Sequence, residues 1–188
     1  MRRETGFRLP QPDAPPPIQA LYALLAADGP RNQQLLDEIA SVLAEGRSPL
    51  VLTERTAHLE YLAERLRERG HRVVTLRGGQ SRKRRAAQAV ELQVDAGAGP
   101  QVVVATGRHV GEGFDCAHLD TLLLALPISW KGTLQQCAGR LHREHPGKAE
   151  VRVIDDVDAE VPALRRMFER RLRGYRAMGY RGDDATGA

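Results

Sequence analysis

The sequence has few of the residues that build disulfide scaffolds or membrane spans. Only two of its 188 residues are cysteine, Cys116 and Cys137, and they form no C-x-x-C pair. This usage suits a reducing compartment and argues against a disulfide scaffold. No apolar run reaches the length of a membrane span, and the start carries no signal-peptide pattern. We therefore expect a soluble, cytoplasmic protein with no membrane partner.

The sequence also lacks two features that would indicate a nucleotide-binding or metal-binding site. The chain has no G-x-x-x-x-G-K-[ST] loop to hold phosphates. Compact metal-ligand pairs are also missing, so we assign no metal ligands, although a site made from Cys116, Cys137, His142 and His145 is conceivable. Aromatic residues make up 4% of the chain, and the single tryptophan, Trp130, either packs in the core or stacks on a base.

The composition is otherwise that of a globular domain with a mild excess of cations. Hydrophobic residues make up 41% and charged residues 28%, and the length allows one domain with a sizeable core. A formal net charge of +4 and a sequence pI of about 9.4 weakly favour anionic partners such as nucleic acid or nucleotides.

Strand-like and helix-like patterns alternate along most of the chain. Short apolar runs predict strands at 49–53, 72–76, 101–106, 120–127 and 149–155. Apolar residues at helical spacing predict helices between and after them, at 56–70, 81–94, 132–143 and 160–180. The alternation predicts an α/β fold of three layers, with a parallel central sheet and helices on both faces.

The pattern divides the chain into five parts. Residues 1–17, rich in arginine and proline, predict an extended arm or linker. Residues 18–46 predict a helical lead-in from a preceding domain, so we expect the native polypeptide to be longer. The α/β domain covers 47–158. A helix packed on that domain is predicted for 159–180, and a frayed tail for 181–188.

Ligands of parallel sheets bind beyond the carboxyl ends of the strands, which makes the following residues candidates. The segment ATGRHVGEGFD (105–115) places Thr106 at a strand end, where hydroxyl and N–H groups can bind a phosphate. Its glycines allow close backbone approach, and Asp115 could accept a hydrogen bond from a sugar. A flexible glycine loop is the alternative.

Two other charged segments are open to more than one interpretation. LRGGQSRKRRAA (76–87) sets cations at a helix start, which suits either a nucleic-acid backbone or a solvated basic face. VRVIDDVD ends a strand with Asp155, Asp156 and Asp158. These acids suit magnesium binding or a metal-dependent nuclease, and structural or helix-capping roles are the alternative.

The segment QQCAGRLHRE (135–144) contains the spacing Q-x-x-G-R-x-x-R. Residues three apart face the same way on a helix, so Arg140 and Arg143 lie side by side. Two neighbouring guanidinium groups suit a ligand with several negative charges, such as a triphosphate. A solvated basic helix is the alternative.

The order of these segments resembles the second RecA-like domain of superfamily 2 helicases of the DEAD/DEAH type, nearest to restriction-enzyme and XPB-like members. ATGRHVGEGFD resembles motif V, QQCAGRLHR resembles motif VI, and LVLTERTAHLEYLAERL resembles motif IV with its helix. LRGGQSRKRR resembles the glycine-containing segment after the next strand. The resemblance covers 49 to about 155, and the first RecA-like domain is missing, so the chain resembles half of a motor.

The resemblance implies that the full-length protein is an ATP-dependent helicase or translocase. ATP and Mg²⁺ would bind between the two domains, with Mg²⁺ held mainly by the first domain of the same polypeptide. Arg143 would be the arginine finger and Arg140 its partner at the γ-phosphate. Gln136, Gly113 and Asp115 would contact ATP or the domain interface. The isolated chain is expected to be inactive.

The resemblance also implies a nucleic-acid track, with DNA favoured over RNA. Thr53, Arg55, Gly78 and Thr106 would line it and contact phosphates rather than bases, which gives little sequence specificity. Two alternatives stay open: a RecA-like adaptor that binds nucleic acid alone, and a magnesium-dependent nuclease built on the three aspartates.

Overall fold

The computed structural model describes residues 2–11, 14–78, 92, 99–107, 117–128, 135–143, 145 and 148–182. The strands in these ranges are β1 (Arg2–Glu4), β2 (Pro49–Thr53), β3 (Val73–Leu76), β4 (Val102–Thr106), β5 (Thr121–Leu124) and β6 (Arg152–Val157). The helices are α1 (Ile18–Ala27), α2 (Gly29–Ala44), α3 (Thr56–Glu68), α5 (Gln135–Leu141) and α6 (Pro162–Ala177). None of these helices is long and apolar enough to cross a membrane.

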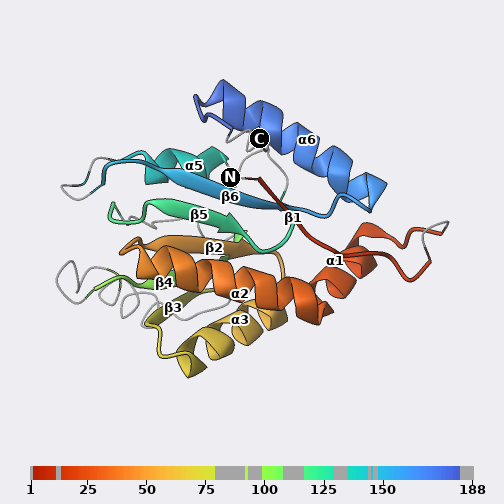
Figure 1. Cartoon of the computed structure of the whole chain (residues 1–188), viewed down its shortest axis with the longest axis horizontal. Helices are drawn as coiled ribbons and strands as arrows, with labels where there is room; N and C mark the ends of the chain where they lie inside the picture. The colour runs from red at the N-terminus through yellow and green to blue at the C-terminus, as the bar shows by residue number, and fades with distance from the viewer. Residues whose placement is uncertain are drawn as a thin grey trace, which may run out of the picture.

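The described strands form one parallel sheet in the order β1-β6-β5-β2-β4-β3 (Figure 1). β2 lies between β4 and β5, and all five of its residues are buried. Strands of a parallel sheet are covered on both faces and need continuous apolar runs, which PLVLT and TLLL supply. The expected α/β fold is therefore confirmed, with strands within a few residues of those predicted at 49–53, 72–76, 101–106 and 120–127.

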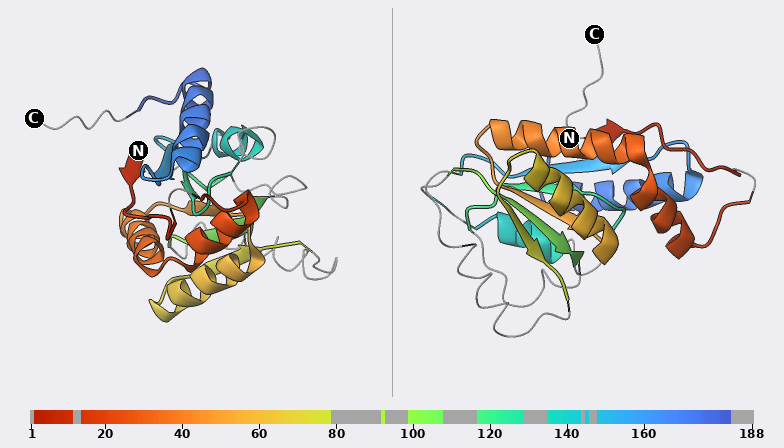
Figure 2. Two further views of the ribbon diagram at one scale, coloured as in Figure 1. Left: turned by 90° about the vertical axis from the view of Figure 1, so that its right-hand side faces the viewer. Right: turned by 90° about the horizontal axis from the view of Figure 1, so that it is seen from below.

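Helices cover both faces of the sheet (Figures 1 and 2). α2 and α3 pack on one face, where Val51 of β2 points. α5 and the carboxyl half of α6 contribute Cys137 and Tyr175 to the other face, where Leu50 and Leu52 point. Alternating side chains along a strand account for this division into two apolar layers.

The helical segment predicted at 18–46 is present and packs in the same core as the sheet. The side chain of Asp28 accepts a hydrogen bond from the N–H of Arg31 at 2.8 Å and so caps the start of α2. Leu36 and Ile39 of α2 are buried against the sheet. The α2 part of this segment thus forms part of the core of this domain, and its role as a lead-in from a preceding domain stays a prediction.

The first residues differ from the extended arm predicted at 1–17. β1 is an edge strand that pairs with the carboxyl half of β6. Arg3 forms ion pairs with Glu38 and Asp156, and Phe7 is buried beyond the strand. A charged strand of three residues has no apolar alternation, so its sequence pattern cannot be told from that of a linker.

The last strand also differs from its prediction. β6 covers 152–157 instead of 149–155, so Asp155 and Asp156 lie within the strand and not at its end. Both carboxylates are buried, and each has an arginine nitrogen within 4 Å. Pairing of this kind makes a buried charge tolerable inside a sheet. The helix predicted at 81–94 falls, except for one residue, outside the described ranges.

Candidate functional site

The carboxyl ends of β2, β4 and β3 bring three predicted site residues to one edge of the sheet. Thr53 and Thr106 are register partners on neighbouring strands. Leu76 pairs with Ala105, so Gly78 follows at the same edge. Thr106 and Gly78 are half-buried. This is the edge at which parallel sheets bind ligands.

Thr53 is fully buried, and a chain of hydrogen bonds starts at its hydroxyl. Its Oγ1 lies 3.0 Å from Nδ1 of His58, and Nε2 of His58 lies 2.9 Å from Oδ1 of Asn32. The Nδ2 of Asn32 donates to the carbonyl of Ala26 at 2.9 Å. Because an amide oxygen only accepts, Nε2 of His58 carries the hydrogen, and Nδ1 accepts the hydroxyl hydrogen of Thr53.

Burial keeps this imidazole neutral. Desolvation is the largest cause that lowers the pKa of His58 from 6.5 to about 4, and the charges of Arg31 and Arg55 lower it further. A neutral ring keeps its acceptor on Nδ1, so the hydroxyl of Thr53 is committed inside the protein. The phosphate contact predicted for the Thr53 side chain has no geometric support, and the residue positions the start of α3 instead.

Replacing His58 by leucine is expected to flatten the loss of stability in acid. The folded pKa of about 4 lies below the ordinary 6.5, so the unfolded chain binds more protons between these values. The neutral imidazole of His58 therefore makes its full contribution to the free energy of unfolding above pH 6.5. This contribution is lost as the pH falls towards 4. At about 1.4 kcal/mol per pKa unit, the wild type should lose about 2–3 kcal/mol more than His58→Leu.

Urea unfolding from neutral pH to about pH 4 measures this difference. The pKa of Asp156 is raised to about 6, mainly by burial, so this group favours the folded state in acid. Its contribution has the opposite sign, is present in both proteins and cancels in the comparison. Equally steep curves for the wild type and His58→Leu would contradict the neutral, buried imidazole.

Arg55 combines a positive charge with partial exposure at this edge. It occupies the N-cap position of α3, and its N–H approaches Oγ1 of Thr53 at 3.5 Å. Its Nη1 donates to the carbonyl of Gln19 in α1 at 3.3 Å. A helix start already favours anions, and the guanidinium adds to that preference.

α5 holds the Q-x-x-G-R-x-x-R segment against the face of the sheet opposite α2 and α3. Cys137 and Leu141 anchor the helix in the core, which leaves Gln136 and Arg143 exposed and Arg140 half-buried. Burial raises the pKa of the Cys137 thiol to about 12, which makes it a poor nucleophile or metal ligand near neutral pH.

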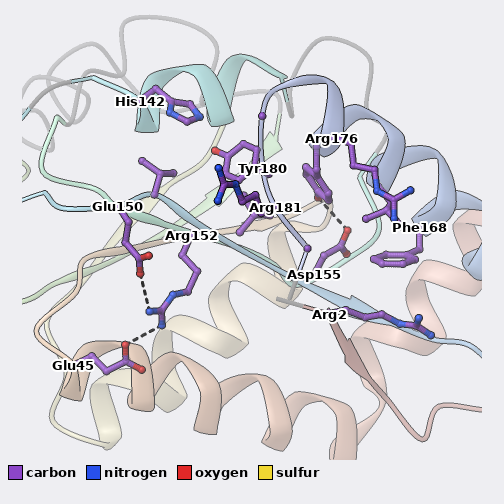
Figure 3. A pocket seen from close by; sticks show the side chains of 16 residues that line it. Arg2, Glu45, His142, Glu150, Arg152, Asp155, Phe168, Arg176, Tyr180 and Arg181 are labelled. Atoms are coloured by element: carbon purple, nitrogen blue, oxygen red, sulfur yellow. Dashed lines mark hydrogen bonds and ion pairs between the residues drawn. The ribbon is translucent and has the colours of Figure 1, made fainter. Parts of the chain in front are cut away.

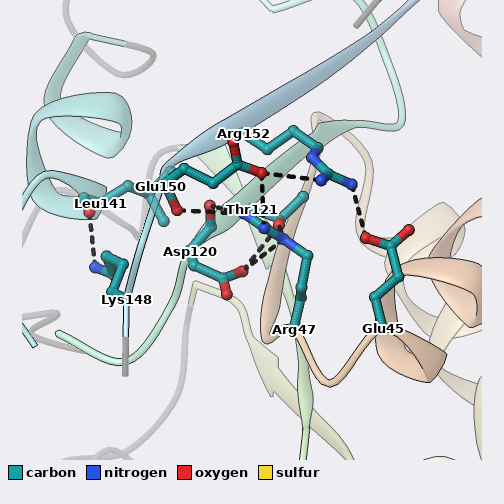
Figure 4. Close-up of polar contacts among 8 residues, drawn as sticks. All are labelled: Glu45, Arg47, Asp120, Thr121, Leu141, Lys148, Glu150 and Arg152. Carbon is teal, nitrogen blue, oxygen red and sulfur yellow. Dashed lines mark hydrogen bonds and ion pairs between the residues drawn. The ribbon is translucent and has the colours of Figure 1, made fainter. Parts of the chain in front are cut away.

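The end of α5 is fixed by Lys148 (Figure 4). Its Nζ donates to the carbonyls of Leu141 at 2.7 Å and Arg143 at 3.0 Å. Arg143 lies two residues beyond the helix end, and its N–H donates to the carbonyl of Arg140 at 3.2 Å. The helix thus ends two residues before the predicted boundary at 143. The lysine satisfies carbonyls that lack intrahelical donors, so the backbone around both arginines is held in place.

The three aspartates of the predicted acidic segment do not form a metal site. Asp155 accepts two hydrogen bonds from Arg171, at 2.7 and 2.9 Å. Asp158 accepts from Arg31 at 3.0 Å. Successive strand residues point to opposite faces, so Asp155 and Asp156 diverge. Across the part of the chain that the structure describes, no group of three or more His, Cys, Asp and Glu side chains could hold a metal ion.

Comparisons with solved structures reproduce the fold. The C-terminal part of the Fun30 ATPase domain matches with a TM-score of 0.64 and 14% identity, over 77% of this chain and 46% of that chain. The C-terminal domain of the DEAD-box protein Dbp5 matches with 0.62 and 16%, over 81% and 80%. The fold is RecA-like.

T4 UvsW matches the same RecA-like domain with a TM-score of 0.69 and 17% identity, over 86% of this chain and 35% of that chain. The chain therefore spans less than half of the Fun30 and UvsW structures, and most of the Dbp5 domain. No family model and no curated protein matches the sequence, so the likeness is one of fold.

Part of the predicted site falls outside the described ranges. Gly113 and Asp115, predicted to lie near ATP, are among these residues, together with Cys116 and Trp130. Their roles stay predictions. The predicted site residues that the structure describes form two sets. Thr53, Arg55, Gly78 and Thr106 lie at the carboxyl edge of the sheet, and Gln136, Arg140 and Arg143 lie on or just after α5.

The buried polar residues of this RecA-like domain were not among the predicted site residues. His58 lies on the same buried helix face as Leu59 and Leu62, where a polar side chain needs a partner. Arg171 likewise lies between Phe168 and Tyr175 on the buried stripe of α6. A polar residue on an apolar helix face indicates a buried polar contact. The partners of His58 and Arg171 come from other elements, so only the fold reveals them.

Proposed function

We propose that this chain is the carboxy-terminal half of an ATP-dependent helicase or translocase. The observation that carries the proposal is Q-x-x-G-R-x-x-R, with Gln136 exposed on α5 and Arg143 exposed just after it, in a RecA-like domain that resembles helicase C-terminal domains. Charge that develops on a transferred phosphoryl group is stabilised by an arginine supplied across the cleft. Arg143 is the finger, and Arg140 its partner at the γ-phosphate.

ATP lies, in this proposal, between this domain and the first RecA-like domain of the same polypeptide. The chain has no phosphate-binding loop, so the first domain holds the phosphates and most of the Mg²⁺ coordination. Arg143, exposed just after α5, and the half-buried Arg140 of α5 fit a triphosphate. Gln136 couples the nucleotide to the cleft, and Gly113 and Asp115 approach the ribose and the domain interface.

Nucleic acid crosses the carboxyl edge of the sheet, with DNA favoured over RNA. Arg55 supplies charge there, and the backbone at Gly78 and Thr106 supplies hydrogen-bond donors for phosphates. Contacts of this kind read the backbone and not the bases. Thr53 acts indirectly, because its bond to His58 fixes the start of α3 and hence Arg55.

A nucleic-acid-binding adaptor that works alone is the second candidate, because the chain has no phosphate-binding loop of its own. The adaptor requires tight single-strand binding without ATP. The motor requires only weak binding, because half of its track lies on the other domain. The nuclease alternative is disfavoured, since Asp155 and Asp158 are each occupied by an arginine.

The isolated chain is expected to hydrolyse ATP no faster than buffer does and to bind single strands weakly. Phosphate release measures the first property. Fluorescence anisotropy with DNA and RNA strands of one sequence measures the second, and log affinity should fall by about 0.7 per phosphate contact for each log unit of salt. Turnover like that of an intact helicase would refute the proposal, whereas sub-micromolar binding without ATP would favour the adaptor.

A further inference from the structure

The outward face of α6 carries arginines that the proposed function does not use. The helix contains six arginines and one glutamate. Arg171 is buried, whereas Arg166, Arg170, Arg173 and Arg176 are exposed. Within the described ranges, none of these four side chains has an ion-pair or hydrogen-bond partner. We call these four residues the α6 arginine face.

The four side chains form a row along one side of the helix. Spacings of four, three and three residues keep them within one face. The row covers about 15 Å, because a helix rises about 1.5 Å per residue. Glu169 is the single acid of α6, and it pairs with a fifth exposed arginine, Arg165, at 3.4 Å. Glu169 lies three residues after Arg166 and four before Arg173, so the row has one acid beside it and keeps a net positive charge.

Within the described ranges, the row differs from the exposed arginines around α3. α6 lies at the outside of the domain, beyond β6 (Figures 1 and 2). Exposed arginines around α3, in contrast, are paired with acids: Arg65 with Glu68, Arg69 with Asp37, and Arg77 with Glu60. Neighbouring like charges on a helix repel one another, and a bound polyanion would offset that repulsion.

The positive charge continues past the end of the helix. A pocket of about 710 Å³ lies beside the carboxyl end of α6, and its lining includes Arg176, Arg2, Arg152 and Arg181 (Figure 3). Of these arginines, Arg152 is paired with Glu45 and Glu150, and Arg2 with Glu4. Among the described residues, Arg176 and Arg181 have no acid within ion-pair distance, so the unpaired positive charge continues from α6 to Arg181 just beyond it.

We propose that the α6 arginine face binds the phosphate backbone of a nucleic-acid duplex. A duplex carries one charge per about 1.7 Å of its axis, so about nine phosphates pass along the 15 Å of this row. Proteins that bind single strands add exposed aromatic rings on which bases stack. The aromatic residues of α6, Phe168 and Tyr175, are buried, which favours the duplex.

The inference rests on the proposed function for the class of ligand, and it assigns a surface on α6, beside β6 and separate from the ends of β2, β4 and β3 where the proposed track lies. In a helicase or translocase, such a surface would hold the part of the duplex that lies ahead of the enzyme or behind it. Contacts to phosphates alone would hold it without regard to sequence.

The test compares duplex binding by the wild type and by R166Q/R170Q/R173Q/R176Q, with anisotropy measured over a salt series. The slope of log affinity against log salt should become shallower by about 0.9 for each phosphate that is no longer neutralised, or by about 3–4 in all. The matched control, R65Q/R67Q/R69Q/R77Q, removes the same charge from around α3 and should keep at least most of the slope. Urea unfolding verifies that both variants stay folded.

Each other outcome is decisive as well. An equally shallower salt slope in both variants would mean that net charge alone accounts for binding, and it would overturn the proposed α6 surface. An unchanged salt slope in the α6 variant would overturn that surface as well. Loss of single-strand binding with duplex binding intact would overturn the choice of ligand. Absence of all binding would overturn the α6 proposal, while the helicase proposal would still be decided separately, by ATP hydrolysis in Arg143→Ala.

Discussion

Under the proposed function, Arg143→Ala is expected to lower the rate of ATP hydrolysis by about 10³–10⁵-fold in a polypeptide that contains both RecA-like domains. The side chain is exposed, and its backbone is fixed by Lys148 and by the carbonyl of Arg140. Truncation should therefore remove charge without disturbing the fold. A finger acts on charge that develops in the transition state, so kcat should fall far more than KM rises.

The control is Arg67→Ala, which removes an exposed arginine of α3 and should leave kcat within about twofold, because surface changes of this kind are usually small. Arg143→Lys should recover little activity, since the planar guanidinium fork is absent. Nucleic-acid binding, measured by anisotropy, should change little in all three variants. Turnover near that of the wild type in Arg143→Ala would exclude the finger assignment.

The central sheet could be predicted from the sequence because its strands are buried on both faces. A run such as PLVLT has few alternatives once turn residues bound it. β1 could not be predicted, since its three charged residues pair with β6 and with Glu38 and Asp156, which the local sequence does not reveal. β6 was misplaced for a related reason, because its two aspartates look like a strand end until their arginine partners are known.

The candidate site divides in the same way. Its backbone positions followed from the rule that parallel strands end at one edge, which the register of Thr53 with Thr106 bears out. Which side-chain atoms are already hydrogen-bonded inside the protein could not be predicted from this rule. A threonine after a strand looks like a phosphate ligand, and only the fold reveals that His58, five residues later, holds its hydroxyl. Spacing predicts where a residue lies, whereas tertiary partners determine which atoms remain available.

Arg171→Met is expected to lower the free energy of unfolding by about 3–5 kcal/mol, the range for breaking a buried ion pair from one side. Both side chains of the Asp155–Arg171 pair are nearly inaccessible, at 4% and 2% exposure. The substitution keeps most of the volume but leaves the carboxylate of Asp155 buried, with the hydroxyl of Tyr175 still donating to it at 3.0 Å. The penalty is therefore that of an uncompensated charge.

A matched control comes from the same helix. Arg165→Met removes the partner of Glu169 from an exposed pair, and such pairs contribute about 0–1 kcal/mol. Asp155→Leu combined with Arg171→Met should recover much of the stability, because no unpaired charge then remains inside. Urea unfolding of the three variants measures this. If Arg171→Met were no less stable than Arg165→Met, apolar packing alone would hold α6 on the sheet, and the buried pair would not be what positions the helix and its arginine face.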